Sequence, residues 1–367
     1  MAKVKLGDIC EIVSGSTPKT SIDEYWDGDI DWITPAEISE DTYIVEESVR
    51  KLTQLGVEKT GLKPFPKGTV ILSSRAPIGK VAIAGKEMYC NQGFKNLICS
   101  DKVLPEYLYW FLRGNTAYLN SLGRGATFKE ISKGIVAEIE INLPDKKEQQ
   151  LSVDTLKKVW DVIVVRRQEL EQLDLLIKAR FVEMFGSIYD NKFGYNVRTL
   201  QDVCEPIKDG THQTPTYIDD SINGFKFLSS KDVTTGKIDW NHLKYIPEEL
   251  HNKLYKRISP RKGDILLAKN GTTGVAAIVD KDEVFDIYVS LALIRPLDIV
   301  VSEYLCSAIN STETKKQFDG SLKGIGVPNL HLGEIKKTQI IVPPIELQNQ
   351  FAAFVAQVDK SKFAVQK

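Results

Sequence analysis

The stretch from Asp145 to Gly186 constrains the fold most strongly, because neither proline nor glycine interrupts it before Gly186. Apolar residues recur at every seventh position, and further apolar residues widen this line into a stripe: Leu156, Ile163, Leu170, Ile177 and Met184, with Val153, Val159, Trp160, Leu173 and Phe181. This pattern predicts a single amphipathic helix. At ~1.5 Å per residue it would span about 60 Å, and its stripe requires a partner helix.

The residues before this stretch are repeated after it. Leu6–Glu11 (LGDICE) is echoed by Leu200–Glu205 (LQDVCE), and Pro66–Leu72 (PKGTVIL) by Arg261–Leu267 (RKGDILL). Five more echoes keep the same order: Asp31–Ile38 with Lys226–Val233, Gly79–Ile83 with Gly274–Ile278, Glu106–Leu108 with Glu303–Leu305, Gly123–Gly125 with Gly324–Gly326, and Glu148–Leu151 with Gln348–Phe351. The two copies are offset by roughly 195 to 200 residues, and so long a period indicates a duplicated domain rather than a solenoid.

We therefore expect an α+β protein of two homologous mixed α/β domains, residues 1–144 and 187–343. The central helix 145–186 joins them, and a second helix, 344–367, follows. Paired antiparallel as a coiled coil, the helices would relate the domains by a pseudo-twofold axis. Judged from the repeat, the second helix is shorter by roughly one to two dozen residues.

Short elements within each copy also follow from the pattern. We expect strands at Thr69–Leu72 and Asp264–Leu267 with hairpin partners at Val81–Ile83 and Ala276–Val279, helices at Pro105–Arg113 and Glu303–Asn310, and closing strands at Ile139–Pro144 and Gln339–Pro343. Asp145 is placed to cap the long helix.

Composition and missing motifs argue against an enzyme. The sequence contains no GxxxxGK[ST] phosphate loop, no GxGxxG, no Asn-Pro-Pro-aromatic motif and no HExxH. All four histidines lie in the second half, so the two copies cannot share a histidine-based chemistry. The five scattered cysteines suit reduced thiols in a cytoplasmic protein. No signal peptide or apolar membrane span is present, and the sequence predicts neither a bound metal nor a cofactor.

Loops rich in small polar and basic residues occupy matching places in the two copies. Ser74 and Arg75 stand where Lys269 and Asn270 stand in the second copy. Such side chains can contact phosphates and base edges, although any one of these loops taken alone is more simply a turn. The candidate DNA-binding residues are Ser16, Thr17, Lys19, Ser74, Arg75, Lys80, Asn91, Gln92, Lys95, Arg124, Thr127 and Lys129, then Lys208, Thr211, His212, Gln213, Lys269, Asn270, Thr272, Thr273, Lys323, Asn329 and His331.

The ordered set of motifs resembles the specificity subunit of Type I restriction–modification systems. The similarity rests on the LxD[IV]CE start of each copy, the Lys-Gly strand with its Gly-x-Ala-Ile hairpin, Leu-Pro followed by Glu-Gln-Gln, and Ile177–Gly186 (IKARFVEMFG). It covers nearly the whole chain and departs at the shorter second helix. The resemblance implies two target recognition domains that each read half of a bipartite DNA sequence, with the helices setting the spacing.

The resemblance also implies partners and cofactors. The helices would dock two methyltransferase subunits that use S-adenosylmethionine, and restriction subunits would bring ATP and Mg²⁺. Aromatic residues beyond the needs of a two-helix seam are candidate docking residues: Trp160, Phe181, Phe185, Phe351 and Phe354. For Leu156, Ile163, Leu170 and Ile177 we prefer a purely structural coiled coil. We interpret Trp26, Trp32, Trp110 and Trp240 as domain core or rim.

Other functions stay open on the sequence. The same scaffold would serve a stand-alone DNA-binding or adaptor protein. A shortened specificity variant would need another chain to complete its second helix. A fused enzyme is disfavoured, because the length leaves no room for a catalytic domain.

Overall fold

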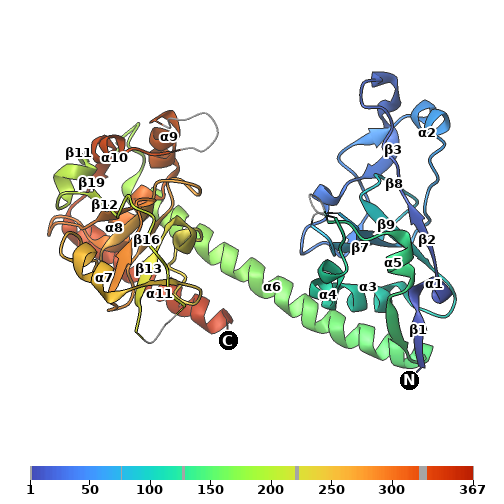
Figure 1. Cartoon of the computed structure of the whole chain (residues 1–367). Helices are drawn as coiled ribbons and strands as arrows, with labels where there is room; N and C mark the ends of the chain where they lie inside the picture. The colour runs from blue at the N-terminus through green and yellow to red at the C-terminus, as the bar shows by residue number, and fades with distance from the viewer. Residues whose placement is uncertain (1, 76, 126–128, 220–222, 322–328, 367) are drawn as a thin grey trace. The chain divides into compact units, whose positions relative to one another are not determined.

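The computed structural model describes residues 2–75, 77–125, 129–219, 223–321 and 329–366. Its contacts divide the chain into two compact units, unit 1 (residues 1–165) and unit 2 (166–367). Each unit mixes helices with short strands, and the long helix α6 (Lys146–Phe185) contributes to both (Figure 1). The expected α+β class with a repeated domain is therefore confirmed.

A five-stranded sheet lies at the centre of unit 1, in the order β2-β9-β6-β7-β4. Its strands are β2 (Cys10–Ser14), β9 (Phe94–Cys99), β6 (Val70–Ser73), β7 (Val81–Ala84) and β4 (Ile44–Val45). Strands β6 and β7 form the predicted antiparallel hairpin. The first three residues of β6 are all apolar because both faces of the strand are covered: Val70 and Leu72 pack into one core cluster, and Ile71 into another.

A second sheet and several short helices complete unit 1. The sheet has the order β5-β3-β8, with β5 (Lys51–Leu52), β3 (Trp26–Ile33) and β8 (Tyr89–Cys90). The α-helices are α1 (Leu6–Ile9), α2 (Gln54–Thr60), α3 (Pro105–Gly114), α4 (Thr116–Ser121) and α5 (Lys133–Ala137), and the 3-10 turns are η1 (Asp23–Tyr25) and η2 (Pro35–Glu37). Trp26 and Trp32 belong to β3 and are both buried, as core residues should be.

Unit 2 repeats this plan. Its central sheet has the order β12-β18-β15-β16, made of β12 (Lys208–Asp209), β18 (Leu291–Ile294), β15 (Ile265–Ala268) and β16 (Ala276–Ile278). The smaller sheet is β14-β13-β17, with β14 (Lys244–Ile246), β13 (Phe225–Leu228) and β17 (Phe285–Ile287). Strand β15 corresponds to β6, and its alternate residues again face two core clusters.

The helices of unit 2 follow the same order as those of unit 1. They are α7 (Glu248–Tyr255), α8 (Ser302–Ile309), α9 (Thr312–Ser321) and α10 (Leu332–Lys337), with 3-10 turns η3 (Leu200–Val203) and η4 (Ser230–Val233). Helices α3 and α8 match the two short helices predicted from the sequence within one residue at each end.

The first and last strands of each copy pair with one another. Strand β1 (Ala2–Lys5) pairs antiparallel with β10 (Glu140–Leu143), and β11 (Asn196–Thr199) pairs with β19 (Gln339–Val342). Strands β10 and β19 lie where the sequence predicts strands before the long helices. Their pairing with the first strand was not foreseen, and it ties the start of each copy to the base of its helix.

The long helices begin as predicted. The N–H of Glu148 donates to Asp145 Oδ1 at 2.9 Å, which caps α6. The second long helix, α11 (Ile345–Gln366), runs antiparallel to the last part of α6 within unit 2. There Phe351 packs on Phe185, and the Lys362 ammonium lies 2.5 Å from Asp174 Oδ1.

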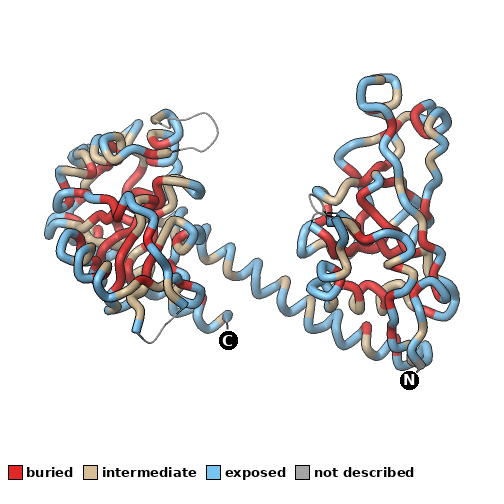
Figure 2. Tube along the Cα trace, viewed as in Figure 1, coloured by how far each residue is buried: buried red, intermediate tan, exposed pale blue. Residues whose placement is uncertain are grey.

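The apolar stripe of α6 is only partly covered. Leu156 and Ile163 are 43% and 39% exposed, Leu170 is half-buried, and Ile177 and Met184 pack against the core of unit 2. Figure 2 shows the corresponding pale-blue stretch along the middle of α6. We expected Leu156 and Ile163 to be covered in a coiled-coil seam, and in the described chain this expectation is wrong. The contacts between α11 and α6 lie in the C-terminal part of α6, beyond these two residues.

A buried glutamine fixes the start of each long helix. Gln149 accepts from the Leu104 N–H at 2.9 Å and donates to the carbonyls of Lys102 and Pro144. Gln348 accepts from the Val301 N–H at 2.9 Å and donates to the carbonyls of Ile299 and Pro343. Gln348 is therefore the counterpart of Gln149, and the match of Glu148 with Gln348 in the sequence is one residue out of register.

We expect Gln348→Leu to lower the free energy of unfolding of unit 2 by about 2 kcal/mol, because it leaves one buried and two partly buried backbone groups without their side-chain partner. Denaturant unfolding followed by amide hydrogen exchange in β15 measures this loss. Gln350→Leu, at an exposed position of the same helix, is the control and should change it by less than ~0.5 kcal/mol. Equal losses in the two variants would contradict the anchoring role.

Candidate nucleic-acid interface

The candidate loops of unit 1 meet at one end of its central sheet. The register pairs Ser14 with Lys95, Ser73 with Phe94 and Leu72 with Val81, so the loops that leave or enter these strands share an edge. The Ser16 N–H donates to the Cys90 carbonyl at 3.0 Å, and the Thr17 hydroxyl donates to Gln92 Oε1.

Glycine permits this close approach. A Cβ on Gly15 would lie 2.0 Å from the Cys90 carbonyl oxygen, so a side chain there would force the loops apart. The same holds in unit 2, where a Cβ on Gly210 would lie 2.0 Å from the Ile287 carbonyl oxygen. The two copies thus build the same loop junction from different sequences.

The turn before α5 completes the cluster of unit 1. Backbone hydrogen bonds join Arg124 and Glu130 in both directions, at 3.0 and 2.9 Å, and the Ile131 N–H donates to the Ser74 carbonyl at 3.0 Å. The predicted residues Ser16, Thr17, Ser74, Arg75, Asn91, Gln92, Lys95, Arg124 and Lys129 thereby lie on neighbouring loops or strand ends.

The loops of unit 2 gather in the same way. Asp209 pairs with Ala292 and Ala268 with Leu291, which places the loops after β12 and β15 at one sheet end. The Leu330 N–H donates to the Lys269 carbonyl at 2.9 Å. The cluster brings together Thr211, His212, Gln213, Lys269, Asn270, Thr272, Thr273 and Asn329.

The remaining predicted residues lie at the margins of these clusters or outside the described structure. Lys19 is exposed near β3. Lys80 ends the hairpin loop that carries Ser74 and Arg75, where its N–H donates to Ser73 Oγ at 2.9 Å and its ammonium donates to the Pro35 carbonyl at 2.9 Å. Lys208 is exposed on β12, and His331 is exposed at the start of α10. Thr127 and Lys323 lie outside the described residues. That these residues contact DNA remains a prediction.

Each cluster contains a buried lysine paired with a carboxylate. In unit 1 the Lys95 ammonium, on a side chain 8% exposed, lies 3.2 Å from Glu130 Oε1. Glu130 Oε2 accepts from Arg75 Nε at 2.9 Å. Burial alone would raise the pKa of Glu130, but the hydrogen bonds and charges of Lys95 and Arg75 outweigh burial and hold it below its ordinary value.

In unit 2 the ion pair joins Asp209 on β12 to Lys269, which directly follows β15. The Lys269 ammonium lies 2.7 Å from Asp209 Oδ2, and both side chains are less than a tenth exposed. Arg257 and His212 approach the same carboxylate at 3.5 and 3.4 Å. Burial opposes ionisation of Asp209, yet Lys269 and His212 together keep its pKa below the ordinary range.

Our sequence reasoning missed the carboxylates Glu130 and Asp209. A usable signal was present, because Lys95 and Lys269 interrupt or directly follow strongly apolar strands (FKNLIC and ILLAKN). A buried lysine needs a partner. The sequence alone does not identify that partner, since Glu130 lies 35 residues from Lys95 and Asp209 lies 60 residues from Lys269.

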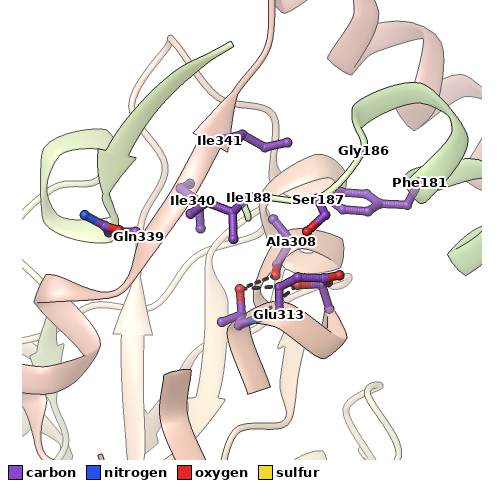
Figure 3. A pocket seen from close by; sticks show the side chains of 11 residues that line it. Phe181, Gly186, Ser187, Ile188, Ala308, Glu313, Gln339, Ile340 and Ile341 are labelled. Atoms are coloured by element: carbon purple, nitrogen blue, oxygen red, sulfur yellow. Dashed lines mark hydrogen bonds between the residues drawn. The ribbon is translucent and has the colours of Figure 1, made fainter. Parts of the chain in front are cut away.

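Three of the proposed docking aromatics are core residues instead. Phe181, Phe185 and Phe351 are 7%, 0% and 0% exposed and pack together with Tyr304. Figure 3 shows Phe181 in the wall of a small, mainly apolar hollow near Ile188, Ile340 and Ile341. Their expected role as a partner surface is therefore corrected: they attach α6 and α11 to unit 2.

The other two docking candidates remain partly accessible. Trp160 is half-buried and packs edge-to-face on Trp110 at 6.0 Å, with the Arg113 guanidinium 4.1 Å from the centre of its ring. Phe354 is half-buried on α11. Both remain predictions as docking residues.

The described residues contain neither a metal site nor a membrane-spanning helix. Within the described ranges, no three His, Cys, Asp or Glu side chains come together to hold a metal ion. None of the described helices is both long and apolar enough to cross a membrane. The chain thus combines two copies of one domain, each with a polar loop cluster at a sheet end, and a long helix.

Comparison with known proteins identifies the family. Residues 1–175 and 193–367 both match the family described as the Type I restriction modification DNA specificity domain. The Type I restriction enzyme MjaIX specificity subunit of Methanocaldococcus jannaschii is 31% identical over 370 residues, covering 96% of this chain and 85% of the relative. The chain belongs to the family of Type I restriction–modification specificity subunits, and it is a DNA-recognition component rather than an enzyme.

Solved structures show the same fold. The Type I restriction–modification S subunit from M. genitalium superposes with a TM-score of 0.53 at 15% identity, covering 100% of this chain and 91% of that one. A chain from a study of complex assembly and conformational transition of the type I R–M system gives a TM-score of 0.52 at 19% identity, with coverages of 99% and 91%.

Proposed function

We propose that residues 1–144 and 187–343 each read one half of a bipartite DNA sequence as target recognition domains. The observation that carries this proposal is the pair of loop clusters, built on equivalent sheet ends but with different side chains. Arg75 and Glu130 in one copy stand where Asn270 and Asn329 stand in the other. A duplicated reader of two unrelated half-sites requires this combination of a common frame and divergent contact residues.

The helices 145–186 and 344–367 would fix the distance between the half-sites, roughly 10 bp centre to centre for one helical turn of DNA. They would also dock methyltransferase subunits, two in the complex. The exposed apolar residues of α6 support this, since Leu156, Val159, Val162 and Ile163 are 39–59% exposed on one helix. Exposed apolar surface of this kind is typical of a protein–protein contact.

The chemistry of the complex would belong to the partners. The methyltransferase subunits would supply S-adenosylmethionine, flip the target adenine and methylate it, and restriction subunits would supply ATP and Mg²⁺. The specificity subunit would place them on DNA in the cytoplasm of a prokaryotic cell, at the nucleoid.

Genome-wide mapping of methylated adenines in the source cell, with and without this gene, tests the proposal. We expect a split motif with two unrelated halves and a fixed gap to lose its methylation on deletion. Unchanged methylation would contradict the proposal. Co-purification with a methyltransferase subunit would separately test docking, and stable specific DNA binding by the chain alone would favour the stand-alone reader.

A further inference from the structure

One loop position differs in its chemistry between the two copies while keeping its place in the fold. A β-bridge joins Arg75 to Glu130 in unit 1, and an equivalent bridge joins Asn270 to Asn329 in unit 2. The residues beside each bridge form matching hydrogen bonds, Ile131 to Ser74 and Leu330 to Lys269. Arg75 and Asn270 are therefore structural counterparts.

The Arg75 guanidinium is held at one edge and open at the other. Its side chain is 47% exposed, and Nε donates to Glu130 Oε2 at 2.9 Å. The other Glu130 oxygen is bound by Lys95, which is itself almost fully buried. Among the described residues, the two terminal nitrogens of Arg75 have no hydrogen-bond partner. Lys95 thus fixes Glu130, and Glu130 fixes the orientation of the Arg75 fork.

The fixed orientation of this fork favours a base edge over a phosphate as its ligand. Glu130 offsets one of the two positive charges of Arg75 and Lys95, which weakens the attraction for a phosphate compared with an unpaired arginine. A guanine presents the uncharged acceptors O6 and N7 in the major groove, and these match two parallel N–H donors of arginine. Asn270 suits adenine instead, because an amide both donates and accepts.

We propose that Arg75 is a specificity-determining residue that reads a guanine in the half-site of unit 1, with Glu130 and Lys95 as its positioning residues. This inference rests on the proposed function of unit 1 as a DNA reader. Asn270 occupies the same position in unit 2, where Asn329 stands in the place of Glu130, so we expect the two half-sites to differ in the base required at this point.

The test uses the full chain co-expressed with its methyltransferase subunits, and methylated adenines are mapped genome-wide. For Arg75→Lys, which keeps the charge but loses the fork, we expect discrimination at one guanine position of one half-site to fall about 10- to 100-fold. Glu130→Gln should weaken discrimination at the same position by a smaller factor. Asn270→Ala should relax a position in the opposite half-site only.

Lys5→Ala, which removes an exposed ion pair with Glu138 outside the loops, is the control and should leave the motif unchanged. Wild-type methylation without a split motif would overturn the proposed function itself. A split motif whose halves both lack a G·C pair sensitive to Arg75 would overturn only the present inference. Uniform loss of methylation in Arg75→Ala, with the motif intact in Arg75→Lys, would assign Arg75 to a phosphate and likewise overturn it.

Discussion

Replacing Phe185 with alanine is expected to lower the free energy of unfolding of unit 2 by about 4 kcal/mol. Phe185 is fully buried at the end of α6, and its ring centre lies 5.1 Å from that of Phe181, 4.8 Å from Tyr304 and 5.5 Å from Phe351. The substitution removes apolar contacts and leaves a cavity among rings that belong to three helices and cannot easily close in on it.

The effect should be confined to unit 2. Chemical denaturation followed by hydrogen exchange reports β15 and β18 for unit 2 and β6 and β9 for unit 1, and the unit 1 strands should keep their protection. Val182→Ala is the matched control on the same helix, since Val182 is 52% exposed and its loss should cost less than ~0.5 kcal/mol. Similar losses in the two variants would show that the rings do not anchor α6.

The same ring cluster shows what the sequence can and cannot predict. Helical periodicity identifies α6 to within a residue at each end, because an uninterrupted apolar repeat has one simple solution. It does not distinguish an aromatic that packs inward from one that faces a partner. Phe181 and Phe185 lie where α6 meets α8 and α11, and that meeting depends on contacts distant in the sequence, such as Phe185 with Tyr304.

The loop clusters also show which features the sequence could predict and which it could not. The internal repeat was sufficient to align Ser74 with Lys269 and Arg75 with Asn270, and the bridges at Glu130 and Asn329 agree with that alignment. The repeat could not predict the ion pairs, because the two copies place the buried lysine at different positions in the fold. Lys95 lies on β9 in unit 1, whereas Lys269 follows β15 in unit 2, so a repeat-based comparison finds no common pattern.

Asp209→Asn should lower the free energy of unfolding of unit 2 by about 3 kcal/mol. The change leaves the buried Lys269 ammonium without the carboxylate that lies 2.7 Å away. This value is at the lower end for breaking a buried ion pair, because exposed His212 and half-exposed Arg257 adjoin the site and bring water close. Denaturant unfolding at neutral pH measures the loss.

A double variant separates the ion pair from the packing around it. In Asp209→Asn combined with Lys269→Met no charge is left buried, so we expect the double variant to be more stable than Asp209→Asn alone. Glu183→Gln breaks the exposed pair of Arg180 and Glu183 and should cost less than ~0.5 kcal/mol. Additive losses in the double variant would contradict a coupled buried pair.

The dependence on pH gives an independent test of the same pair. The pKa of Asp209 in the folded chain lies below its ordinary value of about 3.9, because the effects of Lys269 and His212 exceed the opposing effect of burial. Its stabilising contribution is therefore complete above about pH 5 and disappears as the pH falls below about 4 toward the folded-state pKa. The stability difference between the wild type and Asp209→Asn should shrink over that acidic range. A difference that stays constant with pH would show that the substitution acts through packing and not through the charge of Asp209.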